Sequence, residues 1–198
     1  MDFREFYKQM DSLPAVLLFG GEEEYVKQTA LRDLRKKLLP EGLEALNETV
    51  LEGTVDAMAL EECCETLPFM ADKRLIVLKD CPLAGSRKDG ASGDAKPLIA
   101  YLERLSVHAQ VVFYVRGGYD KAKALVKFIG KQGGIVDFAL LNERDIHAWC
   151  AKYAATAGKK LAPGAVQTLI ERAGRRITDI KAGLDKAIAY AGVRETIG

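Results

Sequence analysis

Three short runs of consecutive apolar residues constrain the fold of this chain most strongly. They lie at residues 15–19, 75–78 and 111–115, and each is apolar throughout instead of alternating between apolar and polar. A strand of this kind has no side suited to water, which is typical of parallel sheets that are covered by helices on both faces. The runs therefore predict a buried parallel sheet.

Helical patterns alternate with these strands along the first part of the chain. Two more strands are expected at residues 48–51 and 135–138. Apolar residues at helical spacing predict the intervening helices, at residues 2–10, 23–39, 56–65, 96–105 and 121–131. Five strands that alternate with helices predict an α/β domain, which we place at residues 1–140.

The pattern changes after Ala139, where only helices are expected. They are predicted at residues 143–157, 163–173 and 178–191. Asn142 is a suitable N-cap, Gly158 and Gly174 can end the first two helices, and Pro163 suits a first helical turn. Residues 141–198 are therefore expected to form a small domain of three helices.

Charge and hydropathy exclude several classes of function. Hydrophobic residues make up 48% of the 198 residues and charged residues 29%, and the net charge is +1. Such a balance gives no general attraction to nucleic acid, so any DNA contact would be local, for example through Arg87 and Lys88 in the polar, glycine-rich segment 85–94. No run is long enough to cross a bilayer, and the N-terminus does not resemble a signal peptide. A cytoplasmic protein is expected.

The cysteines and histidines do not predict a metal site or a catalytic centre. None of the cysteines forms a C-x-x-C pair, and neither histidine has a sequence context that suggests a nucleophile–base pair; the six residues are Cys63, Cys64, Cys81, Cys150, His108 and His147. Buried thiols in a reducing compartment are the expected state. No catalytic residue, cofactor or metal is predicted.

The turn after the first strand invites comparison with a phosphate-binding P-loop. Counting from Gly21, Lys27 falls at the lysine of G-x-x-x-x-G-K-[ST], but Val26 replaces the second glycine and Gln28 replaces the hydroxyl residue. Residues 22–24 are all glutamates, which would occupy the helix N-terminus and repel a triphosphate. After the strand at residues 75–78, Asp80 is followed by Cys81, so the acidic pair of an ATPase is also incomplete.

The stretch L-P-F-M at residues 67–70 has two possible interpretations. Residues beside a buried strand usually pack into the core, which favours burial of Phe69 and Met70. However, Pro68 ends the preceding helix, and an aromatic residue beside a methionine is a common pair of anchors at protein interfaces. From these residues alone we favour the core, and display to a partner stays open.

Three segments together resemble the delta subunit family of the bacterial DNA polymerase III clamp loader. They are "LLFGGEEEYVKQTALRDLRKKLLP", "ETLPFMADKRLIVLKD" and "LLNERDIHAWCAKYAATAGKKLAPGAVQTLIERAGRRITDIKAGLDKAIAYA". The resemblance implies an AAA+-type fold, with a RecA-like first domain and a three-helix lid. It implies a degenerate nucleotide site and no catalysis by the subunit itself, since polymerase activity belongs to the complex.

The resemblance also implies a partner. The delta subunit binds the sliding clamp, the beta subunit of the polymerase, and opens one interface of its ring. The matching contact residues here are Leu67, Phe69 and Met70, so the resemblance favours their display. The residues that follow, Asp72, Lys73 and Arg74, are polar and are expected to form a rim beside them. DNA would be contacted only indirectly, and no membrane is involved.

The chain departs from the family pattern at two places. Thr178 stands where an active AAA+ lid has the arginine of G-x-x-x-R, and the C-terminal collar domain that joins the other clamp-loader subunits is expected to be absent. The alternative function is a divergent P-loop NTPase or nucleotide-binding AAA+ protein, which calorimetry with ATP and magnesium would distinguish.

Overall fold

The computed structural model describes residues 1–86 and 93–198. They form two compact units, one of Met1–Glu22 with Val26–Phe138 and one of Glu23–Tyr25 with Ala139–Gly198. Arg87 and Lys88, the candidates for a local DNA contact, lie outside the described residues.

The first unit is built on a sheet of five parallel strands. The strands are β1 (Val16–Gly20), β2 (Glu48–Glu52), β3 (Arg74–Lys79), β4 (Ala109–Tyr114) and β5 (Ile135–Asp137). Their order across the sheet is β2-β3-β4-β1-β5, and every neighbouring pair is parallel. The predicted fold class is therefore confirmed.

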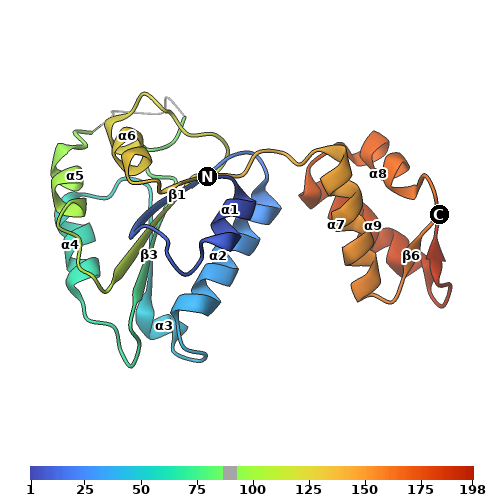
Figure 1. Ribbon diagram of the computed structural model, residues 1–198, viewed down its shortest axis with the longest axis horizontal. Helices are drawn as coiled ribbons and strands as arrows, with labels where there is room; N and C mark the ends of the chain where they lie inside the picture. Colours follow the sequence, from blue (N-terminus) through green and yellow to red (C-terminus); the bar gives the residue numbers. More distant parts are fainter. Residues whose placement is uncertain (87–92) are drawn as a thin grey trace. The chain divides into compact units, whose positions relative to one another are not determined.

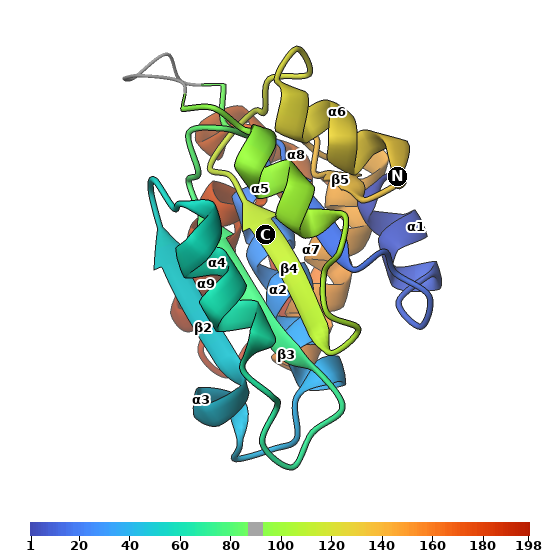
Figure 2. The same ribbon diagram turned by 90° about the vertical axis from the view of Figure 1, so that its left-hand side faces the viewer.

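Helices cover both faces of this sheet, as Figures 1 and 2 show. One face carries α1 (Phe3–Lys8) and α2 (Glu24–Leu38), and the other carries α4 (Ala57–Glu65), α5 (Lys96–Leu102) and α6 (Ala124–Lys131). Alternate residues of β1 enter the two cores. Leu17 joins the core beneath α1 and α2, and Leu18 joins the one beneath α4 to α6. Burial on both sides explains why these strands are apolar throughout.

Three local features of the first unit differ from the sequence-based expectation. Helix α5 ends at Leu102, and α6 begins at Ala124. The carboxylate of Asp120 accepts a hydrogen bond from the backbone N–H of Ala122 at 2.8 Å, which favours a turn over a helix start. A one-turn helix, α3 (Glu44–Asn47), was not predicted, because four residues show no periodicity.

The second unit contains α7 (Glu143–Thr156), α8 (Ala165–Ala173) and α9 (Ile177–Ala191). Asn142 caps α7 as predicted, since its Oδ1 accepts from the N–H of Asp145 at 2.9 Å. The prediction that Pro163 opens α8 was wrong, because that helix begins only after Gly164, which has a φ of 83°. Two unpredicted strands, β6 (Lys160–Leu161) and β7 (Thr196–Ile197), pair in parallel.

Within the part of the chain that the structure describes, none of the helices combines the length and apolar character needed to cross a membrane.

Candidate functional site

The loop between α4 and β3 carries a group of exposed apolar side chains. Helix α4 ends at Glu65, and the chain then runs through the predicted contact residues before β3 begins at Arg74. The exposed fractions are 73% for Leu67, 52% for Phe69 and 77% for Met70. This loop lies at the lower end of the sheet in Figure 2. The three side chains therefore lie outside the core.

The backbone of this loop is held by a side chain that sequence reasoning missed. Asn47, at the end of α3, is fully buried. Its Oδ1 accepts a hydrogen bond from the N–H of Phe69 at 2.7 Å, and its Nδ2 donates to the carbonyl of Phe69 at 2.9 Å. The next residue, Met70, has a φ of 48°, in the left-handed region that non-glycine residues seldom occupy. Asn47 is one polar residue in a helix of four, so the sequence gives no sign of this contact.

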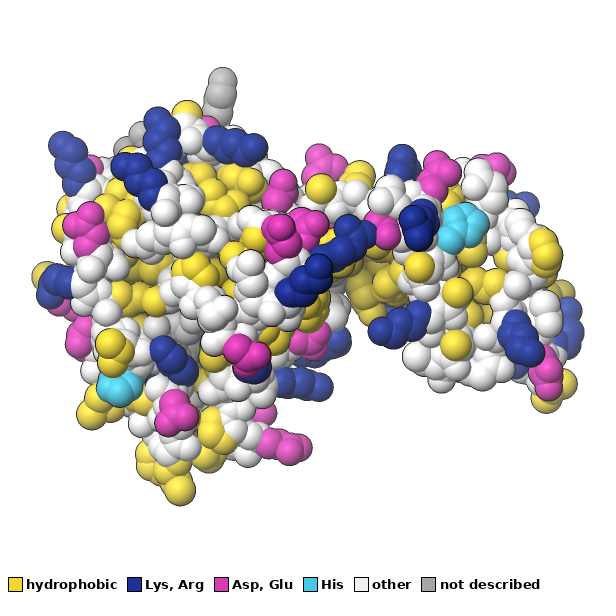
Figure 3. Space-filling model, in the orientation of Figure 1, with side chains coloured by type: hydrophobic (Ala, Val, Ile, Leu, Met, Phe, Trp, Pro, Cys, Tyr) yellow, Lys and Arg dark blue, Asp and Glu magenta, His cyan; other side chains and the backbone are white. Residues whose placement is uncertain are grey.

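Two basic residues join the loop to its neighbours. The ammonium group of Lys73 donates to the carbonyl of Val107 at 2.6 Å, and the Arg74 guanidinium donates to the carbonyl of Leu46 at 2.8 Å. Leu46 and Val107 are themselves 51% and 77% exposed. The apolar surface therefore extends beyond the predicted residues, and Figure 3 shows hydrophobic side chains gathered at this lower end of the first unit.

The turn after β1, where a P-loop would bind phosphate, is filled by the protein's own chain. A Cβ added to Gly20 would lie 2.4 Å from the Tyr119 ring, and one added to Gly21 would lie 2.4 Å from the Phe138 carbonyl oxygen. The N–H of Gly21 donates to the carbonyl of Gly117 at 2.7 Å. These glycines thus allow close internal packing, and this amide is not available to a phosphate group.

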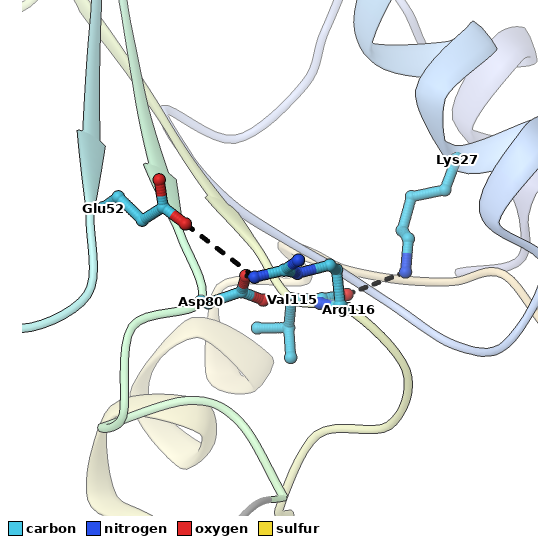
Figure 4. Close-up of polar contacts among 5 residues, drawn as sticks. All are labelled: Lys27, Glu52, Asp80, Val115 and Arg116. Atoms are coloured by element: carbon cyan, nitrogen blue, oxygen red, sulfur yellow. Dashed lines mark hydrogen bonds and ion pairs between the residues drawn. The ribbon is translucent and has the colours of Figure 1, made fainter.

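The lysine of the P-loop comparison is also used internally. Lys27 is fully buried. Figure 4 shows it reaching from α2 to the carbonyl of Val115, where Nζ donates at 2.7 Å, and a second bond at 2.9 Å goes to the carbonyl of Gly21. Backbone oxygens therefore surround the ammonium group in the place where a P-loop lysine would bind phosphate.

The acidic position after β3 is likewise paired. The Asp80 carboxylate accepts from the backbone N–H of Arg116 at 2.9 Å and forms an ion pair with its guanidinium, which also lies 3.8 Å from Glu52 (Figure 4). Cys81 is buried, and burial raises the pKa of its thiol. Among the described residues, no group of three or more His, Cys, Asp or Glu side chains could hold a metal ion.

The adjacent cavity is small. It is lined by Asp80, Cys81 and Val115 among others and has a volume of about 170 Å³. Sites for small molecules commonly have about 300–1,000 Å³. This cavity is therefore smaller than a typical pocket for a small molecule such as a nucleotide.

The sequence predicted that Glu23, one of the glutamates at residues 22–24, occupies the N-terminus of the helix that follows β1. In the structure its side chain bonds to a different helix. Glu23 is 1% exposed, and its Oε2 accepts a hydrogen bond from the N–H of Ile177, the first residue of α9, at 3.2 Å. The other oxygen, Oε1, has no hydrogen-bond partner among the described residues. Glu23 therefore supplies the side-chain acceptor at the start of α9, where the N-cap residue Arg176 makes no side-chain cap.

The stability of the protein should depend on the protonation of Glu23. Burial raises the pKa of this carboxyl above its ordinary value, while the Ile177 N–H opposes the shift. The native state thus holds the proton more tightly than the unfolded chain. The stability that this difference contributes is fully present below the pKa that Glu23 has in the unfolded chain. It is lost as pH rises through the raised pKa that Glu23 has in the native state.

The glutamine of a Glu23→Gln variant does not titrate. We therefore expect wild-type protein to lose stability relative to this variant as pH rises. The loss should begin at about 4.5, the ordinary pKa of a glutamate, and continue through the raised pKa of Glu23. Urea unfolding of both proteins across this range measures the difference. Parallel curves would contradict the prediction.

Comparison with solved structures identifies the fold. The clamp-loader delta protein of Bacillus subtilis aligns over 98% of this chain and 59% of its own, with a TM-score of 0.67 and 22% identity. A DNA polymerase III gamma subunit-related protein of Thermotoga maritima aligns over 92% of this chain and 57% of its own, at a TM-score of 0.50 and 12% identity. Domain III of the Thermotoga maritima replication initiation protein DnaA aligns over 96% of this chain and 82% of its own, at a TM-score of 0.54 and 11% identity. The chain has the fold of clamp-loader and other AAA+-like proteins.

The family follows from the sequence comparison. The model of the DNA polymerase III delta subunit family matches residues 17–139. DNA polymerase III subunit delta of Bacillus subtilis is 24% identical over 191 residues, which are 93% of this chain and 54% of that protein. The chain belongs to the DNA polymerase III delta subunit family, and it spans about half the length of this relative.

Proposed function

We propose that this chain binds the sliding clamp of DNA replication and favours an open interface in the clamp ring. The observation that carries the proposal is the exposure of Leu67, Phe69 and Met70 on one loop whose backbone is fixed by Asn47. Soluble proteins seldom display several large apolar side chains together unless a partner covers them. Membership of a clamp-loader family makes the clamp the partner to test.

Binding energy can open a ring only through a difference in affinity. A ligand shifts an equilibrium between two conformations by as much as it prefers one of them. The apolar side chains would therefore bind a clamp surface that is better formed or more accessible when the interface is open. No nucleotide chemistry by this chain is needed for such a shift.

Titration of the purified sliding clamp into this chain tests the proposal directly. We expect a complex with the wild-type ring, weaker binding to a ring whose interfaces are closed by engineered disulfides, and tighter binding to a clamp variant that cannot close its ring. The absence of binding to all three forms would overturn the proposal. Equal binding to all three forms would support a contact with the clamp but contradict the proposal that this chain opens the ring.

Further assignments belong to the same proposal. The α7–α9 unit would correspond to the helical lid, and other clamp-loader subunits would assemble with the whole protein through a collar domain. Contact with DNA would be indirect, and the protein would act in the cytoplasm without catalysing a reaction itself. These assignments are supported by family membership and by the fold.

We expect no ATP binding in the physiological concentration range. The Gly21 N–H, the Lys27 ammonium group and the Asp80 carboxylate all have internal partners at the position where a P-loop protein would hold nucleotide and magnesium. Calorimetric titration with ATP and Mg²⁺ measures this. A magnesium-dependent dissociation constant in the micromolar range would contradict the expectation and favour the alternative of a divergent NTPase.

A further inference from the structure

We propose that Asn47 is a positioning residue, which holds the loop of Phe69 and Met70 in the backbone conformation that binds the clamp. This inference rests on the proposed function, because it assigns a role in the same contact. Asn47 itself is fully buried, so it would act through the loop and would not touch the clamp.

One amide side chain satisfies both polar groups of a single residue in the loop. Oδ1 of Asn47 accepts from the N–H of Phe69 at 2.7 Å, while Nδ2 donates to the carbonyl of Phe69 at 2.9 Å. Nδ2 also donates to the carbonyl of Leu43 at 3.1 Å, which ties the amide to the start of α3. The backbone of Phe69 is therefore fixed on both sides by a group whose own position is fixed.

The conformation of the next residue shows why such a restraint is needed. Met70 has a φ of 48°, and a non-glycine side chain is strained in this region. A strained residue keeps its conformation only when its surroundings impose it. Phe69, the residue before Met70, is hydrogen-bonded to Asn47 through both its N–H and its carbonyl. The Asn47 amide therefore restrains the backbone directly beside the strained residue.

Fixing the loop before binding would raise the affinity for the clamp. Ordering a flexible segment during association weakens binding, and a segment that is already ordered avoids this loss. Both hydrogen bonds from Asn47 to this loop are made to the backbone of Phe69. The contribution of Asn47 would therefore be to the orientation of both anchors, which distinguishes it from an interface contact.

The test compares three variants with the wild-type chain, using the purified sliding clamp as the probe. Asn47→Ala removes both hydrogen bonds to Phe69. Asn47→Asp keeps an acceptor for the Phe69 N–H but sets a carboxylate against the Phe69 carbonyl. The double variant Phe69→Ala with Met70→Ala tests the anchors themselves, and so separates a failure of this inference from a failure of the proposed function.

We expect Asn47→Ala to bind the clamp about tenfold more weakly, which corresponds to the loss of one to two net hydrogen bonds. Amide hydrogen exchange at Phe69 should be slow in the wild-type chain and fast in the variant, while exchange in β1 and β4 is unchanged. The second measurement shows whether the variant has lost the loop conformation or the whole fold.

The pH dependence of Asn47→Asp gives a readout that a general loss of stability would not produce. A protonated carboxyl group can donate to the Phe69 carbonyl as the amide does, and a buried position beside carbonyl oxygens raises a carboxyl pKa. We therefore expect the affinity of this variant, relative to wild type at the same pH, to recover as pH falls from 8 to about 5.

Two results would overturn the inference while leaving the proposed function intact. One is full clamp affinity of folded Asn47→Ala when the double variant has lost binding. The other is an Asn47→Asp variant whose relative affinity does not change with pH, and this measurement decides the question if Asn47→Ala proves to be unfolded. Full affinity of the double variant would overturn the proposed contact itself.

Discussion

Replacement of both Phe69 and Met70 with alanine is expected to lower the affinity for the sliding clamp about a thousandfold, with the fold intact. Burial of one large apolar side chain contributes roughly 1.5–3 kcal/mol, and truncated interface anchors often cost about 2 kcal/mol or more. Two anchors together should lose on the order of 4 kcal/mol, which is about three powers of ten in the dissociation constant. Titration with the clamp measures this loss.

Thermal unfolding of the same double variant separates display from burial. Exposed substitutions usually change stability by no more than about 0.5 kcal/mol, whereas truncation of a core side chain costs about 2–5 kcal/mol. Because Phe69 and Met70 are 52% and 77% exposed, the melting temperature should change little. Met58→Ala is the matched control, since Met58 on α4 is 79% exposed and should affect neither measurement. A large fall in melting temperature, or clamp binding that survives, would contradict the displayed-anchor hypothesis.

The second large effect is expected at Lys27. In a P-loop enzyme this lysine binds phosphate, so its removal would impair activity more than folding. Here Lys27→Ala removes a donor from the carbonyl oxygens of Gly21 and Val115. Each buried acceptor that is left unsatisfied costs about 1–3 kcal/mol. We expect a total loss of roughly 3–5 kcal/mol, seen as a fall in melting temperature of roughly 6–20 °C.

Lys36→Ala provides the control for this prediction. Lys36 lies on the same helix and is exposed, so its removal should leave the melting temperature within about 2 °C of wild type. Differential scanning calorimetry of both variants, without nucleotide, makes the comparison. A Lys27→Ala protein as stable as Lys36→Ala would show that the buried lysine does not support this turn.

The sequence by itself determined the architecture of the first unit. The apolar runs at residues 15–19, 75–78 and 111–115 became β1, β3 and β4, because a strand that is buried on both faces must be apolar at every position. The order of strands and helices along the chain then required parallel pairing. Short elements such as α3 and β6 escaped prediction, since they are too short to show a period.

The mismatches to the P-loop motif were also visible in the sequence, but the contacts that fill this turn were not. The motif comparison showed that Val26 and Gln28 are unsuited to a P-loop. It could not show that Tyr119 packs on Gly20 or that the Gly21 N–H donates to Gly117. Residues about a hundred positions apart are brought together by the sheet, so no local pattern records these contacts.

Tertiary structure alone decided which residues support the candidate site. The residues considered by themselves favoured burial of Phe69 and Met70, and the fold places both at the surface. Asn47 and Glu23 look like ordinary polar residues in the sequence, yet each is buried and bonded to a backbone group 22 or 154 positions away. A polar side chain follows no periodic rule, because its role depends on which unsatisfied backbone group the folded chain brings within hydrogen-bonding distance.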